Sequence, residues 1–163
     1  GHIVGPGWLP LNPTGNFNPE TFIRLAKGEE IVLPNFGMET VHHVHADDVA
    51  QAFIKAIENR ENALGESFHV VSEQALTLRG YAEAMARSFK QEPNLKFLPW
   101  EEWQKTVSTT DKEMTYDHIA HSPCGSIAKA KELIHYQPKY SSLQAVQEAV
   151  IHYFVKEGIK TNL

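Results

Sequence analysis

Apolar residues recur along this chain with two different periods, and segments of the two kinds alternate. Strand-like runs, in which apolar residues alternate with polar ones or form a short block, lie at 2–4, 30–34, 41–46, 67–71 and 95–99. Apolar positions spaced three and four residues apart predict helices at 19–27, 49–57, 77–89, 100–107, 112–120, 126–134 and 142–157. This order predicts an α/β fold with a small mixed sheet and a helical C-terminal part.

The stretch HHVHADDVAQAF, residues 42–53, begins with three histidines and two aspartates in seven positions. The alternation up to His45 is typical of a strand and the apolar spacing that follows is typical of a helix, so Asp47 or Asp48 is expected to cap the helix. A zinc site is the alternative, because His43 and His45 share one face of the strand. No distant group of histidines or carboxylates has ligand spacing, so a structural junction is favoured and no metal is expected.

The composition limits the kind of protein and its compartment. The chain has 163 residues, 42% of them hydrophobic, which suits one globular domain over 1–163. A net charge of -5 argues against nucleic acid or an anionic membrane as partner, and no apolar run approaches the roughly 20 residues of a membrane span. Cys124 is the only cysteine, so we expect no intrachain disulfide, no cysteine-based zinc site and a cytoplasmic location.

The sequence contains no complete set of catalytic residues. The nucleophile elbow G-x-S-x-G, the P-loop and the dinucleotide motif G-x-G-x-x-G are all missing. Cys124 has His121 three positions before it, but proximity in sequence is weak support for a thiolate–imidazole pair. The side chains of this chain alone therefore predict no reaction.

Four segments, taken in order, resemble one enzyme family. HIVGPG at 2–7, the junction at 45–50, ESFHVVSEQALTLRGYAEAMA at 66–86 and SIAKAKELIHYQPKYSSLQAVQEAV at 126–150 are similar to successive landmarks of the extended short-chain dehydrogenase/reductases, the NAD-dependent epimerase/dehydratase family. Each segment is loose by itself, whereas the four together span nearly the whole chain. The resemblance is to the C-terminal, substrate-binding part of such an enzyme.

In this family an N-terminal Rossmann domain binds NAD or NADP and a Tyr-x-x-x-Lys pair supplies the base, while the C-terminal part holds a small-molecule substrate. Neither G-x-x-G-x-x-G nor Tyr-x-x-x-Lys occurs here, and the chain opens on GHIVGPG. The resemblance therefore implies a single substrate-binding domain without its Rossmann half, inactive alone and with no tightly bound cofactor. The parent would be an NAD(P)-dependent enzyme, and a homodimeric parent fits the family. The resemblance also implies that the junction aspartate both caps its helix and fixes a neighbouring loop.

The sequence defines the substrate less well. Family members that act on UDP-sugars often carry arginine before the junction and near the last helices, because guanidinium binds pyrophosphate oxygens bidentately. Here the strand reads TVHH from Thr40, and 116–126 contains no arginine. The resemblance implies that substrate-binding side chains come from the loop after GPG, the strand and the later helix, namely Asn12, Asn18, His42, His43, His118 and His121. Turn or cap chemistry is the alternative role for both asparagines.

Three functions remain open. The first is the substrate-binding part of a sugar or nucleotide-sugar epimerase or dehydratase. The second is part of a reductase of hydroxysteroid or dihydroflavonol type with an apolar substrate, which the missing arginines favour and the asparagine-rich loop opposes. The third is an α/β binding module with no enzymatic parent.

Overall fold

The computed structural model describes residues 1–160, and its strands form three short pairs instead of one continuous sheet. β1 and β4 pair in parallel, as do β2 and β6, whereas β3 and β5 are antiparallel. The strands are β1 His2–Val4, β2 Ile31–Pro34, β3 Thr40–Val41, β4 His43–His45, β5 Leu76–Thr77 and β6 Leu95–Leu98. The predicted α/β class is confirmed, with the strands in small parallel and antiparallel pairs in place of the one small mixed sheet that the sequence suggested.

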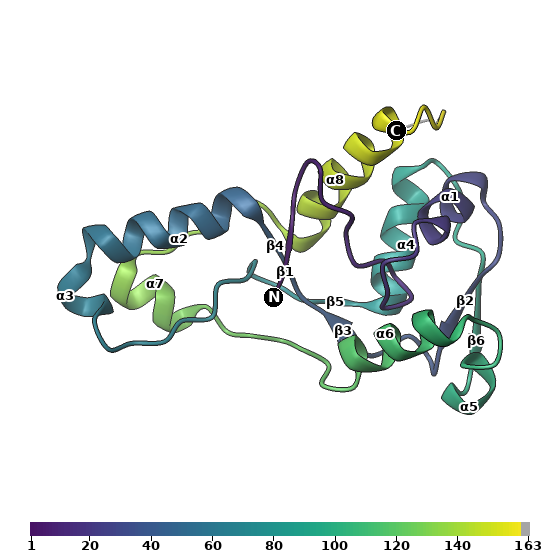
Figure 1. The fold of residues 1–163 in the computed structure, drawn as a ribbon, viewed down its shortest axis with the longest axis horizontal. Helices are drawn as coiled ribbons and strands as arrows, with labels where there is room; N and C mark the ends of the chain where they lie inside the picture. Colours follow the sequence, from purple (N-terminus) through teal and green to yellow (C-terminus); the bar gives the residue numbers. More distant parts are fainter. Residues whose placement is uncertain (161–163) are drawn as a thin grey trace.

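Helices surround these pairs and form two lobes, with β1 and β4 between them (Figure 1). The helices are α1 Glu20–Lys27, α2 Ala46–Glu58, α3 Arg60–Ala63, α4 Leu78–Ser88, α5 Trp100–Trp103, α6 Thr109–Ile119, α7 Ala128–Ile134 and α8 Ser142–Lys156. One lobe holds α2, α3 and α7, and the other holds α1, α4, α5 and α6 with β2 and β6. Among residues 1–160, no helix has the length and apolar character needed to cross a membrane.

Each lobe has its own buried core. In the lobe that holds α1 and α4, aromatic rings of these two helices and of α8 meet, and Phe89 stacks on Phe154 with 5.5 Å between ring centroids. In the lobe that holds α2, α3 and α7, Ala52 of α2 and Ile134 of α7 pack against Val71 and Tyr136. The apolar spacing predicted for α4 and α8 thus corresponds to buried contacts on their inner faces, whereas Phe53, Ile54 and Ile57 of the stripe predicted for α2 are exposed.

Several predicted elements differ from the structure. The helix predicted at 100–107 ends at Trp103, and the strand predicted at 41–46 is divided between β3 and β4. The strand expected at 67–71 is not formed; within the described residues this extended segment is joined to β4 at its end, where the Ser72 amide donates to the His43 carbonyl at 3.2 Å. The helix expected from 112 begins at Thr109, because the Ser108 hydroxyl accepts a hydrogen bond from the Asp111 amide at 3.1 Å and caps it.

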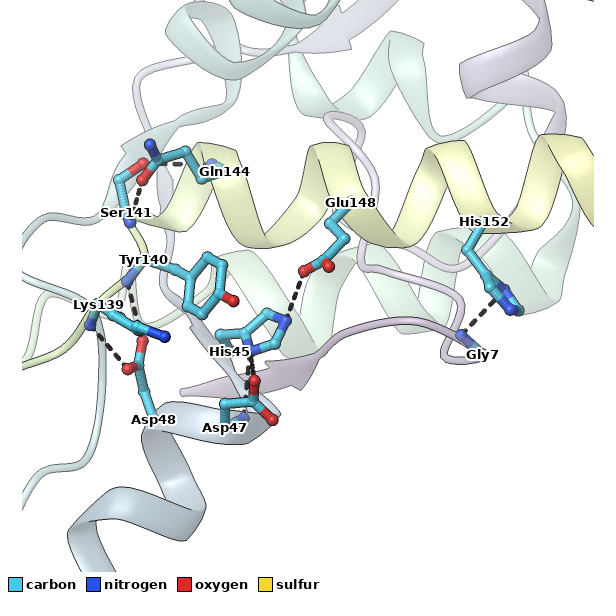
Figure 2. A network of polar contacts seen from close by, with 10 residues as sticks. All are labelled: Gly7, His45, Asp47, Asp48, Lys139, Tyr140, Ser141, Gln144, Glu148 and His152. Carbon is cyan, nitrogen blue, oxygen red and sulfur yellow. Dashed lines mark hydrogen bonds and ion pairs between the residues drawn. The ribbon is translucent and has the colours of Figure 1, made fainter.

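The junction between β4 and α2 is a hydrogen-bonded network that also holds α8 (Figure 2). His45 is the N-cap of α2, since its Nδ1 accepts from the Asp47 amide at 3.1 Å. The prediction that Asp47 or Asp48 caps this helix is therefore wrong, because both lie within its first turn. With Nδ1 as acceptor, Nε2 of His45 carries the proton and donates to Glu148 of α8 at 2.8 Å, while the ring stacks on Tyr140 at 3.9 Å.

Asp48 fixes the chain segment that leads into α8. Its carboxylate is buried and accepts from the amides of Lys139 at 2.7 Å and Tyr140 at 3.1 Å. Hydrogen bonds to a charged acceptor are stronger than neutral ones, and a buried carboxylate without them is costly. Asp48 therefore ties the connector before α8 to the start of α2, two segments that are far apart in the sequence.

We predict that Asp48→Ala lowers the free energy of unfolding by about 3 kcal/mol, because the amides of Lys139 and Tyr140 lose a charged acceptor. Asp47→Ala is the matched control, since the Asp47 side chain is 72% exposed, and it should cost less than about 1 kcal/mol. Urea denaturation followed by circular dichroism measures both values. Equal losses for the two variants would show that the buried carboxylate has no special role.

Candidate functional site

The loop from Asn12 to Asn18 is organised around one buried amide. Oδ1 of Asn12 accepts from the amide and the hydroxyl of Thr14, both at 2.8 Å. Its Nδ2 donates to the Asn16 side chain at 2.7 Å and to the Asn18 carbonyl at 2.8 Å. The structure thus places Asn12, one of the predicted substrate-binding residues, in the loop interior with its donors and acceptor in use, which is the turn chemistry that the sequence left as the alternative.

α6 lies along this loop and is held to it by hydrogen bonds from one helical face. The contacts, spaced four and three residues apart on α6, are Asp111 with Asn18 at 3.1 Å, Thr115 with Asn16 at 3.0 Å and His118 with the Gly15 carbonyl at 3.2 Å. Thr115 is fully buried and also donates to the Thr14 carbonyl at 3.0 Å. Hydrogen bonds between polar side chains and backbone groups therefore hold α6 to the loop.

Gly15 permits the close approach of the loop to α6. Its φ is +84°, a left-handed conformation that side chains disfavour. A Cβ atom built there would lie 2.7 Å from Cγ2 of Ile119 and 3.3 Å from Cγ2 of Thr115. Both the backbone conformation and the space around it therefore require glycine.

A cavity of about 360 Å³ opens beside the loop, between the start of α1, β2 and the turn that joins α5 to α6. Its polar wall consists of Thr14, Asn16, Asn18, Glu20, Thr21, Arg24, Thr106, Ser108 and Asp111. Trp103 forms an aromatic wall and is oriented by its indole N–H, which donates to the Val32 carbonyl at 2.9 Å. Of the six predicted substrate-binding residues, Asn18 alone is among the residues lining this cavity.

Two of the predicted histidines, His43 and His118, lie around a third one that the sequence did not single out, His2. The His2 ring centroid is 6.1 Å from that of His43 and 4.7 Å from that of His118. Nε2 of the fully buried His43 donates to the Leu11 carbonyl at 3.1 Å, which leaves its Nδ1 as a buried acceptor without a partner among the described residues. Burial, and next the nearby His2, lowers the pKa of His43 to about 3, whereas burial and then His118 lower the pKa of His2 to about 4.

The other two predicted histidines lie apart from this group. His42 is buried, with Nε2 donating to the Ser72 carbonyl at 2.9 Å and Nδ1 accepting from the Gly125 amide at 3.2 Å, so its ring joins two later segments to the β-strand region. Burial lowers the pKa of His42. His121 is exposed just beyond the end of α6. Within residues 1–160, no group of three or more His, Cys, Asp or Glu side chains is arranged to hold a metal ion.

Sequence reasoning missed the residues that α6 brings to the cavity. Asp111 lines the cavity, and Thr115 accepts a hydrogen bond from the lining residue Asn16. The spacing of Asp111, Thr115 and His118 on one helical face was a readable signal, but it is a polar pattern and therefore does not stand out in a search for apolar periodicity.

Comparison with known proteins identifies the fold. No protein-family model matches the chain. UDP-glucuronic acid 4-epimerase from Bacillus cereus, solved in complex with NAD, matches 98% of this chain and 44% of its own with a TM-score of 0.62 and 15% identity. An epimerase from Methanothermobacter thermautotrophicus matches 96% of this chain and 42% of its own with a TM-score of 0.63 and 18% identity.

The chain therefore has the fold found in the C-terminal half of NAD-dependent epimerases and dehydratases of the extended short-chain dehydrogenase/reductase type. The resemblance predicted from the sequence is confirmed at the level of the fold. Among curated proteins, the chloroplast stem-loop binding protein of 41 kDa b from Arabidopsis thaliana is 25% identical over 155 residues, which is 89% of this chain and 39% of that protein. The chain spans less than half the length of each of these proteins.

We predict that Gly15→Ala destabilises the protein by about 2 to 4 kcal/mol, because strain at positive φ adds to overpacking against α6. Gly7→Ala is the matched control: Gly7 has a φ of +90°, yet a Cβ atom there meets nothing within 4 Å. The control isolates backbone strain, which costs about 1 to 2 kcal/mol. Thermal and urea unfolding measure both, and equal effects would contradict close packing between the loop and α6.

We predict a pH dependence of stability that arises from His43. The folded pKa of about 3 is below the ordinary value of 6.5, so the unfolded state binds more protons between these values. The stabilisation is complete above pH 6.5 and is lost as the pH falls toward 3, by up to about 1.4 kcal/mol per pH unit.

His43→Gln removes this titration and should give a shallower decline of unfolding free energy between pH 6.5 and 4, by close to one proton. The exposed His121→Gln should retain the wild-type slope. Denaturant unfolding at a series of pH values measures the slopes, and an unchanged slope in His43→Gln would rule out a neutral buried imidazole.

Proposed function

We propose that the chain is the substrate-binding part of an NAD(P)-dependent epimerase or dehydratase that acts on a sugar or a nucleotide-linked sugar. The observation that carries this proposal is the match of 95–98% of the chain to structures named as epimerases, one of them in complex with NAD. The nicotinamide cofactor supplies hydride transfer when bound. Because this chain has no glycine-rich dinucleotide motif and no Tyr-x-x-x-Lys pair, we assign the cofactor and the base to the other half of the parent, and we expect the chain alone to be inactive.

The cavity beside the loop is our candidate for the sugar site. Hydroxyl, amide and carboxylate groups around it provide both donors and acceptors, as hydroxyl-rich rings need. Trp103, which is 1% exposed, contributes a buried aromatic ring to the lining, and its orientation is fixed by its bond to the Val32 carbonyl. Asn18 at the loop end is both exposed and held by Asp111, so its side chain is preorganised for contact.

An exposed apolar stripe on α2 supports a larger parent protein. Phe53, Ile54 and Ile57 are 70%, 55% and 76% exposed and continue the helical spacing from Ala50. Large exposed apolar patches mark interaction surfaces. Among the described residues β1 pairs with β4 alone, although parallel strands are normally buried within wider sheets. We assign both features to contact with the nucleotide-binding half; a homodimeric parent in a reducing, cytoplasmic compartment completes the proposal.

Nucleic acid is a second candidate partner, because the Arabidopsis relative is named as a stem-loop binding protein. Phosphate backbones are bound by clustered lysine and arginine, and the net charge of this chain is -5. We therefore favour the small-molecule partner.

We predict that the full-length parent interconverts or oxidises a sugar substrate with NAD(H) or NADP(H), detected as an absorbance change at about 340 nm or as a product epimer. Within the parent, Asn18→Ala should raise KM about tenfold with a smaller change in kcat, since it removes a contact made to the bound ring. The exposed Asn62→Ala on α3 is the control and should leave both constants unchanged.

Turnover of an apolar ketone instead of a sugar would assign the parent to the reductase type. Absence of any nicotinamide-dependent reaction, together with salt-sensitive binding of an RNA stem-loop, would favour the nucleic-acid partner.

A further inference from the structure

We infer that the cavity beside the loop accepts an uncharged, hydroxyl-rich ring and excludes phosphate. This rests on the proposed function for the location of the site and adds the chemical class of the group that it holds. The inference follows from three features near the cavity that could attract an anion, namely the starts of α1 and α6 and the side chain of Arg24, each of which has a carboxylate of the chain beside it.

The first such feature is the N-terminus of α1, which faces the cavity through Asn18, Glu20 and Thr21. Free amides at a helix N-terminus bind anions. Here the Glu20 amide donates to Oδ1 of Asn18 at 3.1 Å and the Thr21 amide donates to the Asn18 carbonyl at 3.4 Å, while Pro19 has no amide hydrogen. The Glu20 carboxylate adds a negative charge at the same end of the helix, which further disfavours a phosphate.

The N-terminus of α6 also has a capping side chain and an acidic residue in its first turn. The Ser108 hydroxyl accepts from the Asp111 amide at 3.1 Å, and Asp111 places its carboxylate in the first turn. That carboxylate is oriented by the Asn18 side chain at 3.1 Å. An aspartate in this position complements the helix dipole that an anionic ligand would otherwise use.

The remaining feature is Arg24, the one cationic side chain that lines the cavity among residues 1–160. Its Nε lies 3.4 Å from the Glu29 carboxylate, and its terminal nitrogen donates to the Glu30 carbonyl. Two nitrogens of the guanidinium group already have partners within the chain, which opposes bidentate hydrogen bonding to a phosphate. The lining contains the carboxylates of Glu20 and Asp111 and one arginine that is already paired with Glu29, so the wall carries a net negative charge and offers acceptors to ring hydroxyls.

Nuclear magnetic resonance of the 15N-labelled chain tests this inference through the indole N–H signal of Trp103. The probes are methyl β-glucoside, uridine, UDP and pyrophosphate. We expect saturable shifts of the Trp103 indole signal with the glucoside or with uridine. Comparing these two probes distinguishes a free sugar from the ribose of a nucleoside. We also expect the affinity for UDP to be no higher than the affinity for uridine. Saturation by pyrophosphate, a UDP affinity ten or more times that of uridine, or no response to any sugar would overturn the inference.

Charge-neutral variants make the test specific. Glu20→Gln with Asp111→Asn keeps the shape of the wall and should raise the affinity for UDP relative to uridine at least tenfold. Glu61→Gln with Glu132→Gln, two exposed carboxylates on α3 and α7 in the other lobe, changes the net charge equally and should leave the ratio unchanged. An equal change in both pairs would attribute the effect to overall charge and overturn the inference. Nicotinamide-dependent turnover by the parent is measured separately, so a phosphate-binding cavity in an active parent would refute this inference and leave the proposed function intact.

Discussion

The hydrogen bonds of the buried Asn12 side chain set the geometry on which the candidate site depends. A loop rich in proline, asparagine and glycine has no repeating backbone ladder, so its polar groups must find partners one by one. Asn12 satisfies several of them at once and thereby fixes Thr14, Asn16 and the Asn18 carbonyl relative to one another. Because Asn16 and Asn18 then bind α6, the position of that helix follows from the loop, and the cavity is the space that the two leave beside α1 and β2.

The parts of the fold that the sequence predicts well are those with a dense local signal. α4 and α8 have apolar stripes that the structure buries, whereas the stripe predicted for α2 is largely exposed and that helix contributes Ala52 to a core instead. The segment at 67–71 has strand composition but forms no ladder, because strand formation needs a neighbour in the right register and local composition says nothing about that neighbour. The first turn of α6 was not predicted because the face that packs on the loop is polar. A polar face gives no apolar periodicity, and its role depends on contacts with a loop that is distant in the sequence.

The candidate residues show why side-chain type alone predicts a site poorly. Asn12 and Asn18 belong to the same loop, yet one has its amide saturated inside it and the other stands at the cavity. His42 lies between β3 and β4 and His43 begins β4, and one contacts the Ser72 carbonyl while the other contacts the Leu11 carbonyl. Alternation predicted that these two rings would separate, but which of them would meet His2 and His118 depends on contacts across the fold.

The placement of charge around the cavity links folding to specificity. Glu20 and Asp111 stabilise the helices that they begin, since acidic residues in a first turn complement the dipole. The same carboxylates occupy the positions at which a phosphate would otherwise bind, so stabilising these two helices and excluding an anionic ligand are one property of the sequence. A substitution that opened the cavity to phosphate would have to remove a carboxylate from a helix start, and it would therefore lose some stability as it changed the kind of group that the cavity accepts.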